Sequence, residues 1–274
     1  MKLPFTKMHG AGNDFVLIDN RKHQVCLTSA QISKLCDRHY GIGADGLLLV
    51  ELAKNRGDFR MRYYNSDGQE AEMCGNGARC FARYAQRISR SQQETFALET
   101  RSGIIQSTLL GKNVETQMSD PTDYVLRELQ VTGTREMVHF LNIGVPHVVI
   151  FVESVGDIDI SSRGAELRSQ TSFTPSGTNV NFAQVVSDNH LRIRTYERGV
   201  EAETLACGTG AAACALSYHL QNQSVSSPID VTVKGGDTLR VIFESSPKLH
   251  NVRVRGPASF VFDGEIDFCH FSSL

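Results

Sequence analysis

The chain has 274 residues, of which 41% are hydrophobic, and this supplies enough apolar material for one large or two medium-sized domains. A formal net charge of -2 provides no basic surplus for binding a nucleic-acid backbone. The N-terminal stretch is polar and charged, and no apolar run approaches the roughly 18 residues that a membrane helix needs. We therefore expect a cytoplasmic protein with no nucleic-acid or membrane partner.

Alternating apolar and polar residues, separated by turn-forming residues, predict the following elements in chain order. The first half has a helix near 29–38 and strands near 3–8, 14–19, 46–51, 60–64, 95–100 and 103–109. The second half has a helix near 160–168 and strands near 138–142, 147–152, 180–186, 192–196, 229–234, 239–243, 251–255 and 258–267. The polar segment 120–127 is predicted to cross over between the halves, so the pattern indicates two α/β domains with a cleft between them.

The cysteines argue against both a disulfide framework and a metal site. There are seven, an odd number, in a chain that we expect to be cytosolic. No pair has Cys-x-x-Cys spacing, and the nine histidines are scattered. We expect most of these thiols to be small buried hydrophobic groups, namely Cys26, Cys36, Cys80, Cys214 and Cys269.

The two remaining cysteines lie in an internal repeat. Residues 60–78 read RMRYYNSDGQEAEMCGNGA, and residues 192–211 read RIRTYERGVEAETLACGTGA. Both contain Arg-x-Arg-x-Tyr, a turn glycine, Glu-Ala-Glu and Cys-Gly-x-Gly-Ala, which indicates a duplicated domain. In each copy a strand and a turn precede the cysteine, and a run of small and apolar residues typical of a helix follows it. Cys74 and Cys207 should therefore lie at or just before a helix N-terminus.

A cysteine at a helix N-terminus suits acid–base chemistry on an amino acid. The unpaired N–H groups and the positive end of the helix dipole favour the thiolate, and glycines beside the thiol let a carboxylate reach the same N–H groups. Two such thiols on opposite faces of an α-carbon can remove a proton from one face and deliver one to the other. The sequence contains neither GxGxxG after a strand nor GxxxxGK[ST]. It leaves pyridoxal phosphate open, because the lysine that binds this cofactor has no short signature.

Seven motifs resemble the diaminopimelate epimerase family, in the family's order and over essentially the whole chain. They are MHGAGNDFVLID (8–19), GIGADGLL (41–48), YNSDG (64–68), EMCGNGARC (72–80), GTNVNFAQ (177–184), YERGVEAET (196–204) and ACGTGAA (206–212). The resemblance implies interconversion of LL- and meso-diaminopimelate without pyridoxal phosphate or metal, on the route to lysine and peptidoglycan. It also implies a homodimer, and we place Phe262 at its interface.

The fold implied by the resemblance is α/β (α+β), with two pseudo-symmetric domains that each wrap a mixed sheet around a central helix. We expect one domain to comprise 1–119 and a C-terminal strand within 257–274, and to carry Cys74. The other should comprise 120–256 and carry Cys207.

Carried over by motif, Cys74 is the proton donor and Cys207 the acceptor in one direction, with the roles exchanged in reverse. His147 and Glu197 are expected to tune the pKa values of the two thiols. The remaining expected substrate contacts fall into two sets. Those at the α-carboxylate and amine are Gly75, Asn76, Gly208 and Thr209, and those at the distal end are Asn13, Asn65, Asn179, Glu197 and Arg198. Arginine suits bidentate pairing with a carboxylate, and glutamate suits pairing with an ammonium group.

One position departs from the family pattern. The chain has Val145-Pro146-His147 where the family usually has Asn-Pro-His. Valine cannot donate a hydrogen bond to the distal end of the substrate, and losing one such contact weakens the rejection of shorter amino acids. We therefore hypothesise that the protein also racemises glutamate, whose side-chain carboxylate Arg198 can still hold.

Three alternatives remain beside the epimerase. The first is a racemase for glutamate or proline that uses the same two thiols; Glu197 and the three asparagines favour a longer substrate over proline. The second is a redox protein in which Cys74 and Cys207 form a disulfide, which leaves the duplicated glycine-rich helix starts unexplained. The third is a non-catalytic binding protein, which would not need both cysteines.

Overall fold

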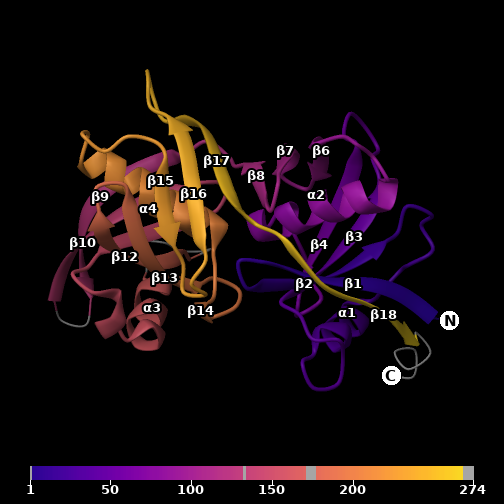
Figure 1. Cartoon of the computed structure of the whole chain (residues 1–274). Helices are drawn as coiled ribbons and strands as arrows, with labels where there is room; N and C mark the ends of the chain where they lie inside the picture. Colours follow the sequence, from indigo (N-terminus) through magenta and orange to yellow (C-terminus); the bar gives the residue numbers. More distant parts are fainter. Residues whose placement is uncertain (1, 132–133, 171–176, 268–274) are drawn as a thin grey trace. The chain divides into compact units, whose positions relative to one another are not determined.

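The computed structural model describes residues 2–131, 134–170 and 177–267. The chain divides into two compact units: unit 1 comprises Met1–Thr116 and Pro257–Leu274, and unit 2 comprises Gln117–Gly256. The chain therefore leaves unit 1 for unit 2 and returns to unit 1 for its final strand (Figure 1).

Unit 1 is a mixed sheet with two helices. Strand pairing gives the order β18, β1, β2, β3, β4, β6, β7, β8, with β5 beside β4; β2 is parallel to β3, β4 is parallel to β6, and the other pairs are antiparallel. The strands are β1 (Lys2–Gly10), β2 (Asn13–Asp19), β3 (Gly46–Leu52), β4 (Phe59–Asn65), β5 (Glu70–Ala71), β6 (Thr95–Thr100), β7 (Gly103–Leu110), β8 (Asn113–Gln117) and β18 (Ser259–Asp267). The helices are α1 (Ser29–Cys36) and α2 (Gly75–Ser89).

Unit 2 has the same kinds of element. Its strand order is β9, β10, β11, β12, β13, β15, β16, β17, with β14 beside β13; β11 is parallel to β12, and β13 is parallel to β15. The strands are β9 (Thr122–Val131), β10 (Thr134–Asn142), β11 (Pro146–Phe151), β12 (Asn179–Ser187), β13 (His190–Glu197), β14 (Ala202–Thr204), β15 (Ile229–Thr232), β16 (Thr238–Glu244) and β17 (His250–Pro257). The helices are α3 (Ile160–Arg168), α4 (Gly208–Gln221) and the short 3-10 helix η1 (Val155–Asp157).

The two units have the same topology, strand for strand. Each pairing in unit 1 has a counterpart of the same direction in unit 2, with α1 matching α3 and α2 matching α4. The C-terminal strand β18 takes the place in unit 1 that β9 takes in unit 2. The predicted duplication is therefore confirmed at the level of the fold.

A half-buried arginine–glutamate ion pair recurs in both units and corrects the alignment of the repeat. Arg62 of β4 forms two hydrogen bonds with Glu70, at 2.9 and 3.0 Å, and Arg194 of β13 forms two with Glu203, at 2.6 and 2.9 Å. Glu70, the first glutamate of its Glu-Ala-Glu run, is therefore equivalent to Glu203, the last glutamate of the other run. In the strand register, Glu70 lies opposite Tyr64 and Glu203 opposite Tyr196. The extra residue lies in the turn of the second copy.

Apolar residues on both faces of the unit 1 sheet explain why it has a helix on each side. In β2, Leu17 packs in the core that contains α2 residues such as Phe81, whereas Val16 and Ile18 pack in the core that contains α1 residues. A strand that is buried on both faces has a continuous apolar sequence, and β3 accordingly reads GLLLVEL. In unit 2 the alanine-rich α4 is buried along nearly its whole length, and it contacts β10, β11, β12, β13, β15 and β16.

Most of the predicted elements are confirmed, with ends that differ by a few residues; α3 matches the prediction of 160–168. The prediction for 120–127 is wrong, because residues from Thr122 onward form the long strand β9 rather than a crossover. Most β9 side chains are exposed, so the segment lacks the alternation of apolar and polar residues by which a strand is recognised. The strands β5, β8 and β14 are short and were also not predicted.

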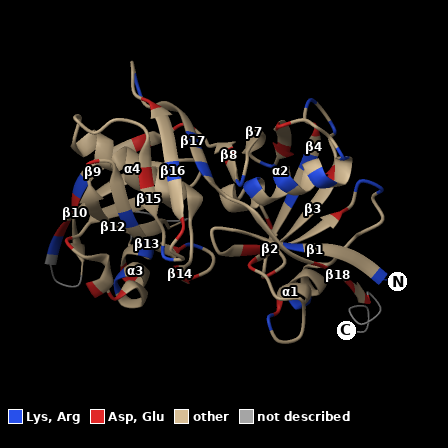
Figure 2. Ribbon diagram, viewed as in Figure 1, with Lys and Arg blue, Asp and Glu red and all other residues tan. Residues whose placement is uncertain are grey.

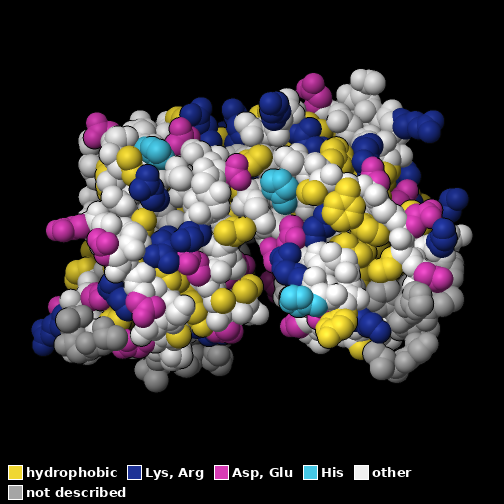
Figure 3. All heavy atoms as spheres, turned by 60° about the horizontal axis from the view of Figure 1, so that its bottom comes forward, with side chains coloured by type: hydrophobic (Ala, Val, Ile, Leu, Met, Phe, Trp, Pro, Cys, Tyr) yellow, Lys and Arg dark blue, Asp and Glu magenta, His cyan; other side chains and the backbone are white. Residues whose placement is uncertain are grey.

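The surfaces of both units carry both signs of charge. Figure 2 shows Lys and Arg residues as well as Asp and Glu residues on the ribbons of both units. In the space-filling view of Figure 3, apolar side chains lie scattered among charged ones. No helix among the described residues is long and apolar enough to cross a membrane.

Candidate functional site

Cys74 and Cys207 occupy the same structural position in the two units. Each is the N-cap of a helix, with extended backbone angles of φ -135° and ψ 120° for Cys74 and φ -125° and ψ 112° for Cys207. The sulfur accepts a backbone N–H bond from the third residue of the helix, from Gly77 at 3.5 Å in unit 1 and from Gly210 at 3.3 Å in unit 2. A sulfur in this position lies at the positive end of the helix dipole, and this favours a negative charge on the sulfur. The predicted position at the helix N-terminus is therefore confirmed for both residues.

In unit 1, amide side chains surround the Cys74 thiol. The Cys74 sulfur lies 3.6 Å from Asn13 Oδ1 as a donor, and Asn76 Nδ2 donates to the same oxygen at 3.1 Å. The fully buried Arg79 donates to Asn76 Oδ1 at 2.6 Å and also to the backbone oxygens of Gly75 and Pro257. Asn13 and Asn76 thus lie at the thiol, with Gly75 as the first residue of the helix.

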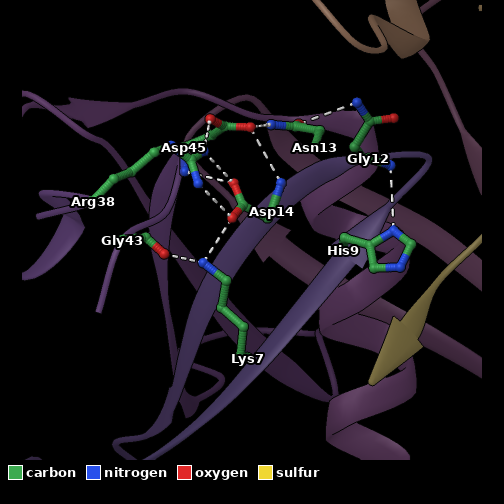
Figure 4. A network of polar contacts seen from close by, with 9 residues as sticks. Lys7, His9, Gly12, Asn13, Asp14, Arg38, Gly43 and Asp45 are labelled. Atoms are coloured by element: carbon green, nitrogen blue, oxygen red, sulfur yellow. Dashed lines mark hydrogen bonds and ion pairs between the residues drawn. The ribbon is translucent and has the colours of Figure 1, made fainter. Parts of the chain in front are cut away.

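A charged network lies behind Asn13 (Figure 4). Asp45 accepts from Asn13 Nδ2 at 2.7 Å and from Arg38 Nη2 at 2.7 Å. Arg38 also donates to both carboxylate oxygens of Asp14, at 3.1 and 2.8 Å, and the buried Lys7 pairs with Asp14 at 2.7 Å and donates to Gly43 O. Burial acts to raise the pKa of Asp14, but hydrogen bonds from Arg38 and Lys7 outweigh it and lower this pKa to about 2.

In unit 2, an uncharged network lies against the Cys207 helix start. The Cys207 sulfur is 3.4 Å from Thr209 Oγ1, and Cys207 is 7% exposed, whereas Cys74 is half-buried. A Cβ on Gly210 would lie only 2.4 Å from Asn181 Oδ1, so the absence of a side chain at this position lets Asn181 pack beneath the helix N-terminus. Asn181 Oδ1 accepts from Thr195 Oγ1 at 3.0 Å.

His147 is fully buried, and its contacts fix its tautomer. Asn181 Nδ2 lies 3.1 Å from His147 Nδ1 and donates to Val148 O at 2.9 Å. Because the amide nitrogen can only donate, Nδ1 accepts, and the neutral ring carries its proton on Nε2. This Nε2 is buried and has no hydrogen-bond partner among the described residues. Burial lowers the pKa of His147 to about 3, and the positive charge of Arg198 acts in the same direction, so the ring is a neutral N–H donor.

The residues expected at the distal end of a substrate in unit 2 lie together at the ends of β12 and β13. Asn179 bridges two loops: its Oδ1 accepts from the Arg198 backbone N–H at 2.9 Å, and its Nδ2 donates to Pro146 O at 3.3 Å. Glu197 accepts from Thr204 Oγ1 at 2.8 Å. Glu197 and Arg198 are half-buried, and Asn179 is 4% exposed. Asn179 therefore holds the backbone of this cluster in place.

The remaining predicted positions are placed as follows. Asn65 ends β4 in unit 1, is half-buried, and makes no side-chain hydrogen bond to another described residue. Gly208 and Thr209 open α4. Val145 is half-buried in the turn before β11, where its backbone oxygen accepts from the Ile143 N–H at 3.0 Å.

The prediction of buried, inert thiols is confirmed at three of the other five cysteines. Cys36, Cys80 and Cys214 are buried, and burial raises the pKa of Cys36 and of Cys80 to about 12 and that of Cys214 well above its ordinary value. Cys26 is exposed, so the prediction is wrong for this residue. It lies in the irregular segment between β2 and α1. Cys269 lies outside the described residues.

Sequence reasoning missed the residues that support the site from behind. Arg38, Asp45, Arg79, Asn181 and Thr195 each hydrogen-bond to a predicted site residue or to one of its neighbours. Asp45 lies within GIGADGLL and Asn181 within GTNVNFAQ, so the motifs contain them, but nothing in the sequence tells a supporting residue from a contacting one.

Comparison with known proteins shows the family to which the sequence is similar. The family model described as diaminopimelate epimerase matches residues 5–124 and 139–261. A diaminopimelate epimerase from Aquifex aeolicus (strain VF5) is 40% identical over 276 residues, covering 96% of this chain and 98% of the relative. One from Chlorobaculum tepidum is 40% identical over 261 residues, covering 94% and 99%.

Solved structures show that the fold extends beyond close relatives. A hydroxyproline epimerase from Agrobacterium vitis, solved with bound trans-4-hydroxy-L-proline, superposes with a TM-score of 0.77. It is 13% identical, and the match covers 100% of this chain and 95% of the other. At this level of identity the similarity shows a shared fold.

Proposed function

The chain belongs to the diaminopimelate epimerase family, and we propose that it interconverts LL- and meso-diaminopimelate with Cys74 and Cys207 as the two acid–base groups. The observation that carries the assignment of the cysteines is their equivalence: each is the N-cap of the corresponding helix in one of two units of the same topology. The product supplies lysine and peptidoglycan synthesis, as it does in the family that the motifs indicate.

The proposed reaction needs one thiolate and one thiol. The Cys207 thiolate, stabilised by the Gly210 N–H, takes the α-proton from one face, and the electron pair of the broken C–H bond moves into the α-carboxylate as an enolate. The Cys74 thiol then delivers its proton to the opposite face, and a new C–H bond of inverted configuration forms. Cys207 ends as a thiol and Cys74 as a thiolate, which is the starting state for the reverse reaction.

Backbone N–H groups take the place of a cofactor in this proposal. The N–H groups at the starts of α2 and α4 bind the α-carboxylate and stabilise its developing negative charge, in the manner of an oxyanion hole. Gly75, Asn76, Gly208 and Thr209 lie at these helix starts. His147 and Glu197 are proposed to tune the pKa values of the two thiols, with the His147 ring kept neutral by burial.

The proposal is tested by replacing each cysteine and following LL-diaminopimelate conversion by chiral chromatography, in reducing buffer and with no added cofactor. Cys74→Ala and Cys207→Ala should each lower kcat by about 10²–10⁴-fold, which is the range for removing a general acid or base. Cys26→Ala, at the exposed thiol, is the matched control and should retain wild-type activity. Retention of activity by either active-site variant would show that the assignment is wrong.

Substrate breadth is a separate proposal that rests on Val145. The distal cluster of Asn179, Glu197 and Arg198 is present, but the half-buried valine offers no side-chain donor. We expect slow α-proton exchange with L-glutamate, followed by proton NMR in deuterated buffer. The control is Val145→Asn, which should suppress this exchange while keeping activity on diaminopimelate. Exchange with L-glutamate no faster than in Cys74→Ser would end the proposal.

The family resemblance also supports a cytoplasmic homodimer. Phe262 in β18 is 48% exposed, although its ring packs edge-on against Phe5 with centroids 5.9 Å apart. Its neighbours Phe260 and Val261 are also exposed. If this strand forms the dimer interface, Phe262→Glu should shift the mass measured by light scattering from dimer to monomer. A monomeric wild-type protein would contradict the proposal.

A further inference from the structure

A continuous chain of hydrogen bonds runs through the Cys74 site, and a charged group lies at each end. At one end Arg79 donates to Asn76 Oδ1, and Asn76 Nδ2 donates to Asn13 Oδ1. The Cys74 thiol donates to the same Asn13 oxygen. At the other end Asn13 Nδ2 donates to Asp45 Oδ2, and Arg38 donates to Asp45 Oδ1 (Figure 4).

The charged ends determine which way both amides face. A guanidinium group has only donors, so Arg79 requires the oxygen of Asn76 and turns the Asn76 nitrogen toward Asn13. An ionised carboxylate has only acceptors, so Asp45 requires the nitrogen of Asn13 and turns the Asn13 oxygen toward Cys74. Rotating Asn13 by half a turn would set donor against donor at Asn76 and acceptor against acceptor at Asp45.

We propose that Asp45 and Arg79 are positioning residues that lock the Asn13 oxygen onto Cys74 and thereby hold this cysteine in its proton-donating thiol form. An acceptor beside sulfur favours S–H, whereas an amide N–H in the same place favours the thiolate. The inference rests on the proposed role of Cys74 as a proton donor. It assigns a function to the GIGADGLL motif, which supplies Asp45, without placing Asp45 in contact with a substrate.

The ionisable groups around this network in unit 1 lie on several elements. Besides Asp45 and Arg79 they are His9 of β1, which accepts from the Gly12 N–H, Lys7 of β1, which pairs with Asp14 of β2, Arg38 of the loop after α1, and Cys80 on α2. Asp45 and Arg38 are 43% and 56% exposed, and they touch the thiol only through Asn13. A change at Asp45 therefore acts through the direction of one amide and through the loss of one charge.

Two substitutions at Asp45 separate these effects. In Asp45→Asn, the charge-assisted bond from Arg38 keeps the amide oxygen on that side, although the neutral Asp14 backbone N–H also donates to the other Asp45 oxygen, at 3.2 Å. The new amide then presents its nitrogen to Asn13, which must turn its own oxygen away from Cys74. Asp45→Ala removes the same negative charge but presents no donor. A purely electrostatic role predicts the same result for both variants, whereas the proposed lock predicts a larger effect for Asp45→Asn.

The measurement is the rate of iodoacetamide alkylation of Cys74 from pH 6 to 9, with the modified peptides quantified by mass spectrometry. In Asp45→Asn we expect about tenfold faster alkylation of Cys74 at pH 7, a pH profile shifted to lower pH, and a smaller shift in Asp45→Ala. Cys207, measured in the same digest, should change less than about twofold and serves as an internal reference. Asp19→Asn is the control: Asp19 is the last residue of β2, away from Asn13, and like Asp45 it is an aspartate that pairs with an arginine, Arg21.

Steady-state kinetics complete the test. In Asp45→Asn, kcat for LL-diaminopimelate should fall about tenfold and KM should change less, because the main loss is the proton donor, although the Asn13 amide that turns is also an expected substrate contact. Equal alkylation profiles for Asp45→Asn and Asp45→Ala, or profiles equal to that of Asp19→Asn, would overturn the proposal. Thermal unfolding shows whether Asp45→Asn folds. If it does not, the test rests on Asp45→Ala, and a Cys74 alkylation profile equal to that of Asp19→Asn would then overturn the proposal.

The outcome separates this inference from the proposed function. If Cys74→Ala is inactive but the Asp45 variants leave the pH profile of Cys74 alkylation unchanged, the assignment of Cys74 stands and only the positioning role of Asp45 and Arg79 is wrong. Active Cys74→Ala would remove the proton-donor role itself, whatever the alkylation profiles show.

Discussion

The two cysteines share one position in one duplicated fold, but different kinds of group support them. Around Cys74 the supporting groups are charged: Arg79 lies on one side, and Asp45, Arg38 and Asp14 lie on the other. Around Cys207 they are neutral: Asn181 lies against the helix start and contacts Thr195 and His147, whose low pKa keeps the ring uncharged. Duplication therefore preserved the helix cap and the topology, while the surroundings of each thiol diverged.

This divergence suits a reaction in which the two thiols start in different protonation states. Beside Cys207, the side chains of Asn181, Thr195 and neutral His147 form an uncharged network, and the Gly210 N–H that donates to the sulfur favours a thiolate. The Cys74 surroundings offer the thiol an acceptor oxygen of fixed orientation. A symmetrical fold thus supports an asymmetric pair of acid and base.

We expect the largest loss of stability when one group is removed from the charged network in unit 1. Asp14→Asn leaves Lys7, whose side chain is 8% exposed, without its carboxylate partner, and we expect the free energy of unfolding to fall by about 3 kcal/mol at pH 7. Because the folded-state pKa of Asp14 is lowered to about 2, the wild-type advantage is complete above the ordinary value of 3.8 and disappears as the pH falls through 2. Urea unfolding at pH 7 and pH 2.5 measures both effects.

The control for this prediction is Asp263→Asn, which removes an exposed carboxylate paired with Arg87. It should change stability by less than about 1 kcal/mol, since the pair is open to solvent. Equal losses of unfolding free energy in Asp14→Asn and Asp263→Asn would show that the network behind Asn13 contributes no more to stability than an exposed ion pair does.

The helix start in unit 2 should be less tolerant of added bulk than the one in unit 1. Gly210→Ala would place a methyl group 2.4 Å from Asn181 Oδ1, so we expect a loss of about 2 kcal/mol together with reduced kcat. Gly77→Ala would bring its methyl group no closer than 3.4 Å to Cys74 Cβ, which is ordinary contact, and should be nearly neutral. Thermal unfolding of the two variants side by side checks the contrast, and equal shifts in Tm would contradict it.

In unit 2, His147 should make the free energy of unfolding depend on pH. Its folded-state pKa is about 3 and its ordinary value 6.5, so between these values the unfolded chain binds a proton that the folded chain does not. Stability should therefore fall as the pH decreases through this window, by about 2 kcal/mol from this residue at pH 5. His147→Gln should show a shallower pH dependence of urea unfolding between pH 7 and 5. Parallel curves would mean that the histidine is not held neutral by burial.

The smallest expected effect is at Thr204, which holds Glu197 through one hydrogen bond of 2.8 Å. Thr204→Val keeps the shape and removes the donor, so about 1 kcal/mol of binding or stability should be lost. We expect this loss to appear as a severalfold higher KM for diaminopimelate, with little change in Tm. Thr122→Val, at an exposed hydroxyl that contacts Asp123, is the control and should leave KM unchanged.

The elements that depend on local pattern could be predicted from the sequence. The two cysteines were placed at helix starts because Cys-Gly-x-Gly-Ala follows a strand and a turn in both copies, and the burial of α4 follows from its alanine content. The strand β9 could not be predicted, because its exposed side chains leave no periodic signal. The supporting residues depend on contacts between distant segments: Asp45 meets Asn13 only because β3 pairs with β2.

The central claim is that inversion uses two different bases, and the fate of deuterium during the first turnovers tests it most directly. LL-diaminopimelate is incubated with the wild-type enzyme in deuterated buffer, and substrate and product are separated and analysed by mass spectrometry before a tenth of the substrate is converted. With one thiol on each face, deuterium should appear in the meso product while the recovered LL substrate stays unlabelled. Equal labelling of recovered substrate and product from the start would show that a single base serves both faces, and would contradict the account.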